Sequence, residues 1–405
     1  GVNAGNSIAS GGNYNVVVGD NAGTAITTGD ENIAVGYNAL ITEDTGSRSV
    51  AIGSSALKLQ NVNGNIYNTA VGYNAGTAVT TGYQNTFIGG LAGTATTTAL
   101  NNTAVGYSSL TANTTGANNT GVGTSALAAN TTGDDNASFG HGSLLVNTTG
   151  FQNTAVGRAA MDSNTTGSLN ASLGYTSLQK NTTGTNNTGL GHSALRANTT
   201  ASNNTAVGYN SLTANTTGAN NVCVGYEAGD AITTGGGNII LGKGADTDAT
   251  TNFATVIGYN LTGAANYTTL GTGADDIRAQ HGTATWATVS DQRYKKDIVD
   301  STTGLSFINA LQPRTFKYKT LGELPETFSA YEEGSTEVFK NSDTNHGFIA
   351  QEIKAAIDAD SSIADGFKLW DDREDGSQEV AEAALIPILV KAIQELTARI
   401  TTLEG

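Results

Sequence analysis

The stretch NTAVGYSSLTANTTGA, residues 102–117, recurs with small changes along most of the chain and decides its fold. One glycine in each copy marks the period, and successive marks are 17 residues apart except for one step of 19. These marker glycines are Gly19, Gly36, Gly53, Gly72, Gly89, Gly106, Gly123, Gly140, Gly157, Gly174, Gly191, Gly208, Gly225 and Gly242, after which the pattern loosens through Gly258 and Gly271. Self-similarity at a short fixed period indicates a solenoid, in which each repeat forms one coil that stacks on the next.

Each coil is expected to contain one short strand just before its marker glycine. The residue before the glycine is a sizeable apolar one, such as Val35, Ile52 or Val105, and we expect it to point inward. The residue before that is usually small, as at Ala34 and Ala51, and the next one back is Thr, Val, Ile or Ala. This alternation is the period of two that is typical of a strand.

A second apolar position four residues after most marker glycines predicts another wall of the same core. It is occupied by Leu40, Leu57, Leu110, Leu127, Leu144, Met161, Leu178, Leu195 and Leu212. Thr-Thr-Gly corners lie between the second apolar position of one coil and the strand of the next, since glycine allows the positive φ of a tight turn. Four residues before nearly every marker glycine is an asparagine, such as Asn32 or Asn102, and stacking would align these amides in a ladder. The sequence therefore predicts a mainly β chain, a β-solenoid or flattened β-roll of 17-residue coils.

The thinness of such a coil favours association of several chains. About 15 coils at about 4.8 Å give a rod on the order of 70 Å long, and each coil offers few apolar side chains to its interior. A rod of this kind is more stable when several chains share one core along the axis. We therefore expect a parallel homotrimer.

One repeat unit is close to a known pattern. SVAIG, residues 49–53, resembles the N-S-V-A-I-G-type units in the head repeats of trimeric bacterial adhesins, and the resemblance extends over about residues 10–260. The 17-residue period is longer than the usual adhesin unit.

Composition limits the classes of partner. Asp and Glu outnumber Lys and Arg by 35 to 19, so nucleic acid and anionic lipid are repelled, and neither is expected as a partner. The single cysteine, Cys223, and four scattered histidines provide no disulfide framework and no zinc spacing, so we expect no metal and no cofactor. No apolar run is long enough to span a membrane.

The composition changes near residue 290. All three prolines and 21 of the 35 acidic residues lie beyond that point, which marks a new domain. We expect a repeat-built fibre over residues 1–265, a closing segment over residues 266–289, and a smaller domain over residues 290–405. Trp286 is expected to cap the end of the rod. Because the chain starts at Gly1 without Met, we expect it to be a fragment or a processed product.

Four ordered segments of the last domain carry a second resemblance. They are SDQRYKKDI at residues 290–298, LQPRTFKYK at 311–319, HGFIAQE at 346–352 and LIPILVKAIQEL at 385–396. Together they resemble the intramolecular chaperone auto-processing domain at the end of phage endosialidase-type tailspikes and tail fibres. The resemblance implies an α+β domain that directs trimer folding and then cleaves itself off, once and in cis.

The resemblance places the cut at the Val289–Ser290 bond. Ser290 needs a base to take its proton, and an amine serves when its surroundings lower its pKa. Lys295 is the candidate base, with Arg293 among the neighbouring cations. The predicted activity is therefore that of a single-turnover serine peptidase with a Ser-Lys dyad.

Two further residues complete the predicted site. Asp291 is expected to orient the reacting group or to cap a helix, and His346 to assist or to make a structural hydrogen bond. The alternative is that Ser290 is an ordinary helix N-cap, because serine followed by aspartate is also a common helix start.

The last helix carries a heptad stripe formed by Leu389, Ile393, Leu396, Ile400 and Leu403. This spacing favours a coiled coil between chains. An amphipathic helix packed on its own domain is the alternative.

Taken together, the sequence predicts a phage tail-fibre or tailspike segment for host attachment. It is expected in the virion tail after assembly in the host cytoplasm, joined upstream to other tail proteins and bound to a host cell-surface glycan or protein receptor. The alternatives are a bacterial trimeric adhesin, disfavoured by the charged C-terminal helix, and a fibre that depolymerises glycans, disfavoured because the few acids of the repeats fall at corners. Tyrosines after the marker glycines form either a packing ladder, which we favour, or an exposed strip for sugars.

Overall fold

The computed structural model describes residues 1–273, 275–282, 287–288, 292, 295–363, 367–373 and 376–404. The chain divides into two compact units, Gly1–Val289 and Ser290–Gly405, and each is described by itself.

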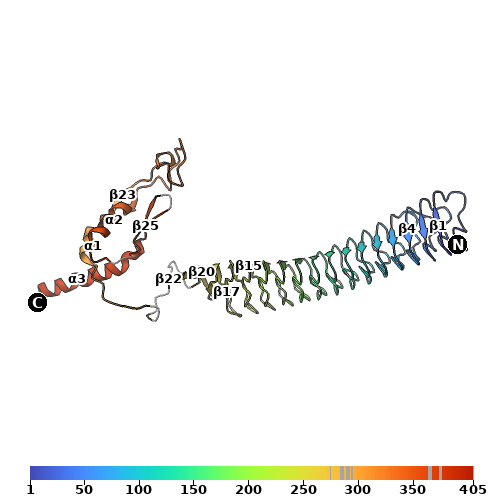
Figure 1. Cartoon of the computed structure of the whole chain (residues 1–405), viewed down its shortest axis with the longest axis horizontal. Helices are drawn as coiled ribbons and strands as arrows, with labels where there is room; N and C mark the ends of the chain where they lie inside the picture. The colour runs from blue at the N-terminus through green and yellow to red at the C-terminus, as the bar shows by residue number, and fades with distance from the viewer. Residues whose placement is uncertain are drawn as a thin grey trace. The chain divides into compact units, whose positions relative to one another are not determined.

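The first unit is the predicted β-solenoid. One three-residue strand per coil pairs in parallel with the strand of the next coil, and Figure 1 shows the coils in succession from β1 to β20. The strands are β1 (Val16–Val18), β2 (Ile33–Val35), β4 (Val50–Ile52), β6 (Thr69–Val71), β7 (Thr86–Ile88), β8 (Thr103–Val105), β9 (Thr120–Val122), β10 (Ala137–Phe139), β11 (Thr154–Val156), β12 (Ala171–Leu173), β13 (Thr188–Leu190), β14 (Thr205–Val207), β15 (Val222–Val224) and β16 (Ile239–Leu241). The prediction of a mainly β solenoid with 17-residue coils is confirmed.

The last coils depart from the period. β18 (Thr255–Tyr259) and β20 (Tyr267–Thr272) continue the parallel stack, and β21 (Asp275–Gln280) then pairs antiparallel with β20. β22 (Ala287–Thr288) pairs antiparallel with β21. Short corner strands form two further sheets, β3 (Gly46–Ser47) with β5 (Gly64–Asn65) and β17 (Asp246–Thr247) with β19 (Thr262–Gly263). Trp286, expected to cap the rod, lies outside the described residues.

The prediction of which strand residues point inward is wrong. The small middle residues, such as Ala34 and Ala104, are fully buried, whereas the large residues before the marker glycines are partly exposed, Ile52 by 38% and Leu173 by 50%. The cause is the narrow interior of the coil. In most coils a buried leucine or methionine, such as Leu110, already occupies that interior, so only a small strand residue fits opposite it.

The interior has two alternative fillings. Most coils place a fully buried leucine or methionine four residues after the marker glycine, as predicted, and Leu110 adopts φ of 50° there. Other coils have glycine at this position, and the space is filled from elsewhere. A Cβ added to Gly93 would lie 2.4 Å from the ring of Phe87, a strand residue that is larger than the usual alanine. Core volume is therefore conserved from coil to coil.

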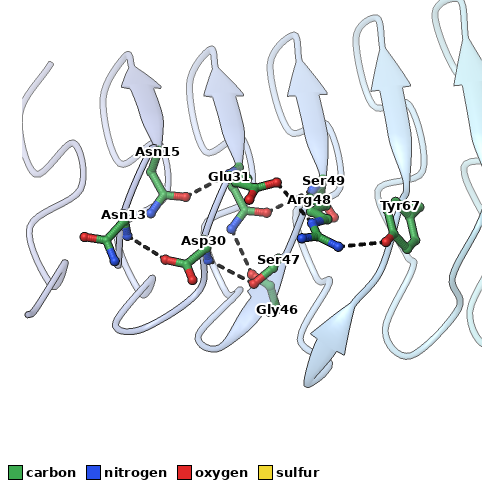
Figure 2. A network of polar contacts seen from close by, with 10 residues as sticks. Asn13, Asn15, Asp30, Glu31, Gly46, Ser47, Arg48, Ser49 and Tyr67 are labelled. Carbon is green, nitrogen blue, oxygen red and sulfur yellow. Dashed lines mark hydrogen bonds and ion pairs between the residues drawn. The ribbon is translucent and has the colours of Figure 1, made fainter. Parts of the chain in front are cut away.

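The predicted asparagine ladder is confirmed, with a specific bonding pattern. The Oδ1 atom of Asn119 accepts a hydrogen bond from the backbone N–H of Asn136 on the next coil (3.0 Å), and its Nδ2 donates to the carbonyl of Gly133 (2.8 Å). Figure 2 shows the start of this column at Asn15. The amides stay buried because the backbone groups of adjoining coils satisfy them.

A second asparagine ladder was not predicted. It runs at the corner residue seven positions after the marker glycine, through Asn113, Asn130, Asn147, Asn164, Asn181, Asn198 and Asn215. Each amide after Asn113 donates to the preceding amide oxygen, as Asn130 Nδ2 does to Asn113 Oδ1 at 2.8 Å. The sequence signal was the Asn-Thr-Thr corner itself, interpreted only as a turn.

One coil interrupts the first ladder. Ser49 stands where the neighbouring coils have Asn32 and Asn68, and the buried amide of Gln60 donates to the Ser49 hydroxyl (2.9 Å) and to Glu43 Oε2 (2.9 Å). Gln60 Oε1 then accepts from Asn68 Nδ2 at 2.8 Å, which restores the connection. This network belongs to the coil with the 19-residue step.

The second unit is a small α+β domain. Its elements are α1 (Leu305–Ala310), β23 (Arg314–Phe316), η2 (Leu321–Glu323), β24 (Asn345–Gly347), α2 (Ala350–Ala359), β25 (Trp370–Asp372), β26 (Gln378–Val380), η3 (Glu382–Leu385) and α3 (Ile386–Glu404). Phe307, Ile353, Leu369, Leu385 and Ile388 form its core, so α1, α2 and α3 all contribute to one apolar cluster.

Candidate processing site

Most residues of the predicted cleavage site lie outside the described residues. These are Val289, Ser290, Asp291 and Arg293. Lys295 is described, and it is exposed, with its backbone N–H donating to the carbonyl of Gln292 at 3.0 Å. The pairing of the Ser290 hydroxyl with the Lys295 amine therefore stays a prediction.

His346 lies in a two-stranded antiparallel sheet. β23 and β24 pair so that Thr315 faces His346, and the His346 side chain is exposed. The sheet joins two of the segments on which the sequence resemblance rests, residues 311–319 and 346–352. The fold thus brings these segments together, while the role of His346 in cleavage stays a prediction.

An ion pair that sequence analysis missed ties the same two segments together. The guanidinium of Arg314 donates to both carboxylate oxygens of Glu352, from Nε at 2.9 Å and from Nη2 at 2.7 Å. This two-point contact lowers the pKa of the Glu352 carboxyl and raises the pKa of Arg314. The partners are 38 residues apart, so no local pattern reveals them.

The surface beside this ion pair is hollowed. The hollow has a volume of about 400 Å³ and is lined by Ala310, Gln312, Arg314, Glu352, Ala355 and Ala356. Its two charged groups, Arg314 and Glu352, are already paired with each other, and three alanines complete the lining with Gln312. Among the residues that the structure describes, no group of three His, Cys, Asp or Glu side chains is placed to hold a metal ion.

The C-terminal helix is packed on one side only. Ile388 and Ala392 are buried in the domain, and Glu395 accepts a hydrogen bond from the backbone N–H of Leu305 (3.0 Å), which satisfies one of the donors in the first turn of α1. The heptad residues lie on an exposed face: Leu389 is 42% exposed, Ile393 62%, Leu396 44%, Ile400 52% and Leu403 85%. The helix therefore packs on its own domain and still presents a full apolar stripe.

The tyrosine column of the rod is a stacked ladder in its second half. Rings of Tyr175, His192, Tyr209 and Tyr226 follow one another with centroids 5.1–5.2 Å apart. Lys243 then lies over Tyr226, with its Nζ 5.6 Å from the ring centroid. Because the rings face each other, their faces are covered, which supports the packing interpretation over a sugar strip.

The few acids of the rod serve its corners. Asp134 accepts a hydrogen bond from the backbone N–H of Ala117 (2.7 Å), and Asp135 one from the amide of Asn118 (3.1 Å). Asp246 is partly buried, and this burial, with a hydrogen bond to Asp230, raises its carboxyl pKa to about 7. The described helices include none that is long and apolar enough to cross a membrane.

Fold and sequence together define a β-solenoid of 17-residue coils followed in the chain by a small α+β domain. Within the C-terminal unit, residues 290–360 match the family model described as chaperone of endosialidase, Peptidase_S74. The match supports a C-terminal chaperone domain of this kind and confirms that part of the sequence interpretation. Comparison with curated proteins and with solved structures finds no match for the chain.

Proposed function

We propose that this chain is a segment of a phage tail fibre or tailspike whose C-terminal domain directs homotrimer folding and then cleaves itself off. The observation that carries the proposal is the family match over residues 290–360, which begins at the residue that would follow the cut. The rod is the lasting product. It would be located in the virion tail, where it attaches to a host cell-surface glycan or protein receptor.

The trimer role draws support from α3. Its exposed stripe from Leu389 to Leu403 has the spacing of a coiled-coil seam, and a single domain leaves it uncovered. Three such helices in parallel would hold three chains level at their C-termini. Aligned chain ends lower the entropic cost of the non-local pairing that a shared rod requires.

The proposed cleavage is an acyl shift followed by hydrolysis. Ser290 Oγ attacks the carbonyl carbon of Val289 while Lys295 Nζ takes the hydroxyl proton and passes it to the departing Ser290 nitrogen. This step replaces the amide by an ester between Val289 and Ser290. Water then hydrolyses the ester, giving a Val289 carboxylate and a free amino group at Ser290.

Mass spectrometry and a denaturing gel test this cut. The parent protein should give two fragments with a new N-terminus at Ser290, whereas Ser290→Ala and Lys295→Ala should give one full-length band. Lys296→Ala is the matched control, because it removes a neighbouring cation and leaves the proposed base, and it should cleave. Equal cleavage of Ser290→Ala and the parent would exclude the serine mechanism.

A further inference from the structure

The outward side of the strands forms an apolar column along the whole rod. It consists of the residue before each marker glycine: Val18, Val35, Ile52, Val71, Ile88, Val105, Val122, Phe139, Val156, Leu173, Leu190, Val207, Val224, Leu241 and Ile257. We call this set the outer strand column. Every member is Val, Ile, Leu or Phe, and Val18, Phe139 and Leu173 are 55%, 41% and 50% exposed.

The strand face that carries this column contains no charged residue. The other outward position, two residues earlier, holds only Thr, Val, Ile or Ala from Val16 to Thr255. Other columns of the rod do accept charge, as Arg158 and Lys243 in the tyrosine column and Glu31 and Arg48 at a corner show. A continuous exposed apolar face without charge indicates an interaction surface.

The regularity of the column identifies the partner. A protein that covers the column must present apolar groups about every 4.8 Å over a length on the order of 70 Å. A second copy of the rod meets this requirement, because it carries the same column with the same spacing. The chain carries a net charge of −16, so self-association on any charged face would be opposed. The electrostatic repulsion between two copies is smallest where their outer strand columns meet, because this face carries no charged residue.

The geometry of the column favours three copies around an axis. Each coil contributes one member of the outer strand column, which suits a threefold axis where each chain adds a single group of the column at every level. A column one residue wide gives a flat twofold interface little to bury. We infer that the outer strand columns of three parallel, in-register copies meet along the fibre axis and form a second core outside the coils.

This inference rests on the homotrimer of the proposed function and adds the surface and register of contact. Cysteine cross-linking in the full chain tests it. Leu173→Cys places a thiol on the column, and Thr183→Cys places one on the exposed corner of the same coil as a matched control. The native thiol of Cys223 is buried, and burial raises its pKa, so it contributes little background.

Under mild oxidation, Leu173→Cys should give a disulfide-linked dimer band on a non-reducing gel, with the third thiol left free. Thr183→Cys should stay monomeric on the same gel. When differently tagged Phe139→Cys and Leu173→Cys chains are co-expressed, mixed dimers should be absent. In-register copies hold these residues two coils apart, about 10 Å, beyond the reach of a disulfide.

A second measurement does not depend on disulfide formation and applies where the geometry of the thiols prevents it. In the native trimer, maleimide should label Thr183→Cys rapidly and Leu173→Cys at least tenfold more slowly. A trimer by light scattering in which Leu173→Cys labels as fast as Thr183→Cys would overturn the inference and leave the homotrimer intact. Mixed Phe139–Leu173 disulfides would overturn the register. A monomer by light scattering would instead refute the homotrimer.

Discussion

The rod and the C-terminal domain are stabilised by opposite arrangements of contacts. In the rod, hydrogen bonds repeat between residues 17 apart, as between Asn119 and Asn136, and each coil contacts only its neighbours. In the domain, Glu395 bonds Leu305 across 90 residues, and Thr303 bonds Ser362 across 59. Stability in the rod is a sum over similar units, whereas the domain depends on a few contacts that form together.

This difference assigns different tasks to the two regions. Repetition determines how one coil sits on the next, but a chain of near-identical coils offers neighbouring chains many equivalent alignments. The domain has no internal repeat, so in the proposed trimer its copies would have a single alignment. Alignment of chains is thus expected to originate in the domain and then extend into the rod.

The largest expected effect comes from the core of the domain. Phe307→Ala removes a fully buried ring from a small cluster and should cost about 3–5 kcal/mol of unfolding free energy. Since few contacts remain to compensate, we expect loss of soluble trimer, measured by light scattering of the expressed full chain. A wild-type yield of trimer would show that the domain does not direct assembly.

A comparable large-to-small substitution in the core of the rod should destabilise only the coils near it. Leu144→Ala removes a fully buried side chain and should cost about 2–5 kcal/mol in its own coil. The coils beyond its neighbours are expected to keep their protection, because coupling between coils is short-ranged. Hydrogen exchange followed by peptide mass spectrometry measures this. Uniform loss of protection along the rod would contradict the proposed contrast.

The second asparagine ladder predicts a smaller loss. Asn147→Ala leaves Asn130 Oδ1 without its donor from the next coil and should cost about 1–3 kcal/mol. Thermal unfolding of the variant measures the change, with Thr149→Ala at the exposed corner of the same coil as the control. An equal effect of the two substitutions would mean that the ladder adds no stability.

The smallest effect is expected from pH at the C-terminal coils of the rod. The carboxyl pKa of Asp246 is raised from 3.8 to about 7, mainly by burial, so the folded coil favours the protonated acid. Its stabilising contribution is therefore complete below about pH 4 and is lost as the pH rises through about 7. Hydrogen exchange at pH 5 and pH 8 should show faster opening at pH 8. Asp246→Asn should remove this dependence, and Asp134→Asn should retain it.

Sequence reasoning predicted the elements of the rod that depend on local period. The strand positions, the buried Leu110 class and the first asparagine ladder follow from the 17-residue repeat. Sequence reasoning predicted wrongly that Val35 and Ile52 point inward. The alternation of residues shows that a strand has two faces, but it does not show which face lies inside the coil. That choice depends on the volume already filled by the buried leucine of the coil, which is a three-dimensional quantity.

The domain was less predictable for a related reason. Its class followed from resemblance, and the family match supports it, but the pairing of Arg314 with Glu352 and of Glu395 with Leu305 joins distant segments. No periodic pattern marks such pairs. The arrangement of Ser290 with Lys295 lies outside the described residues, so that part of the site still rests on the sequence.

The constant step between coils also has an evolutionary consequence. Between Asn113 and Asn215 the coils are alike in core and corner, and each contacts only its neighbours. An in-frame loss or gain of one repeat there leaves both ends of the fibre with unchanged surroundings and alters its length by about 4.8 Å. Recombination between repeats can therefore change the length of the rod one coil at a time. The reach of the rod changes, while the structures at its two ends stay the same.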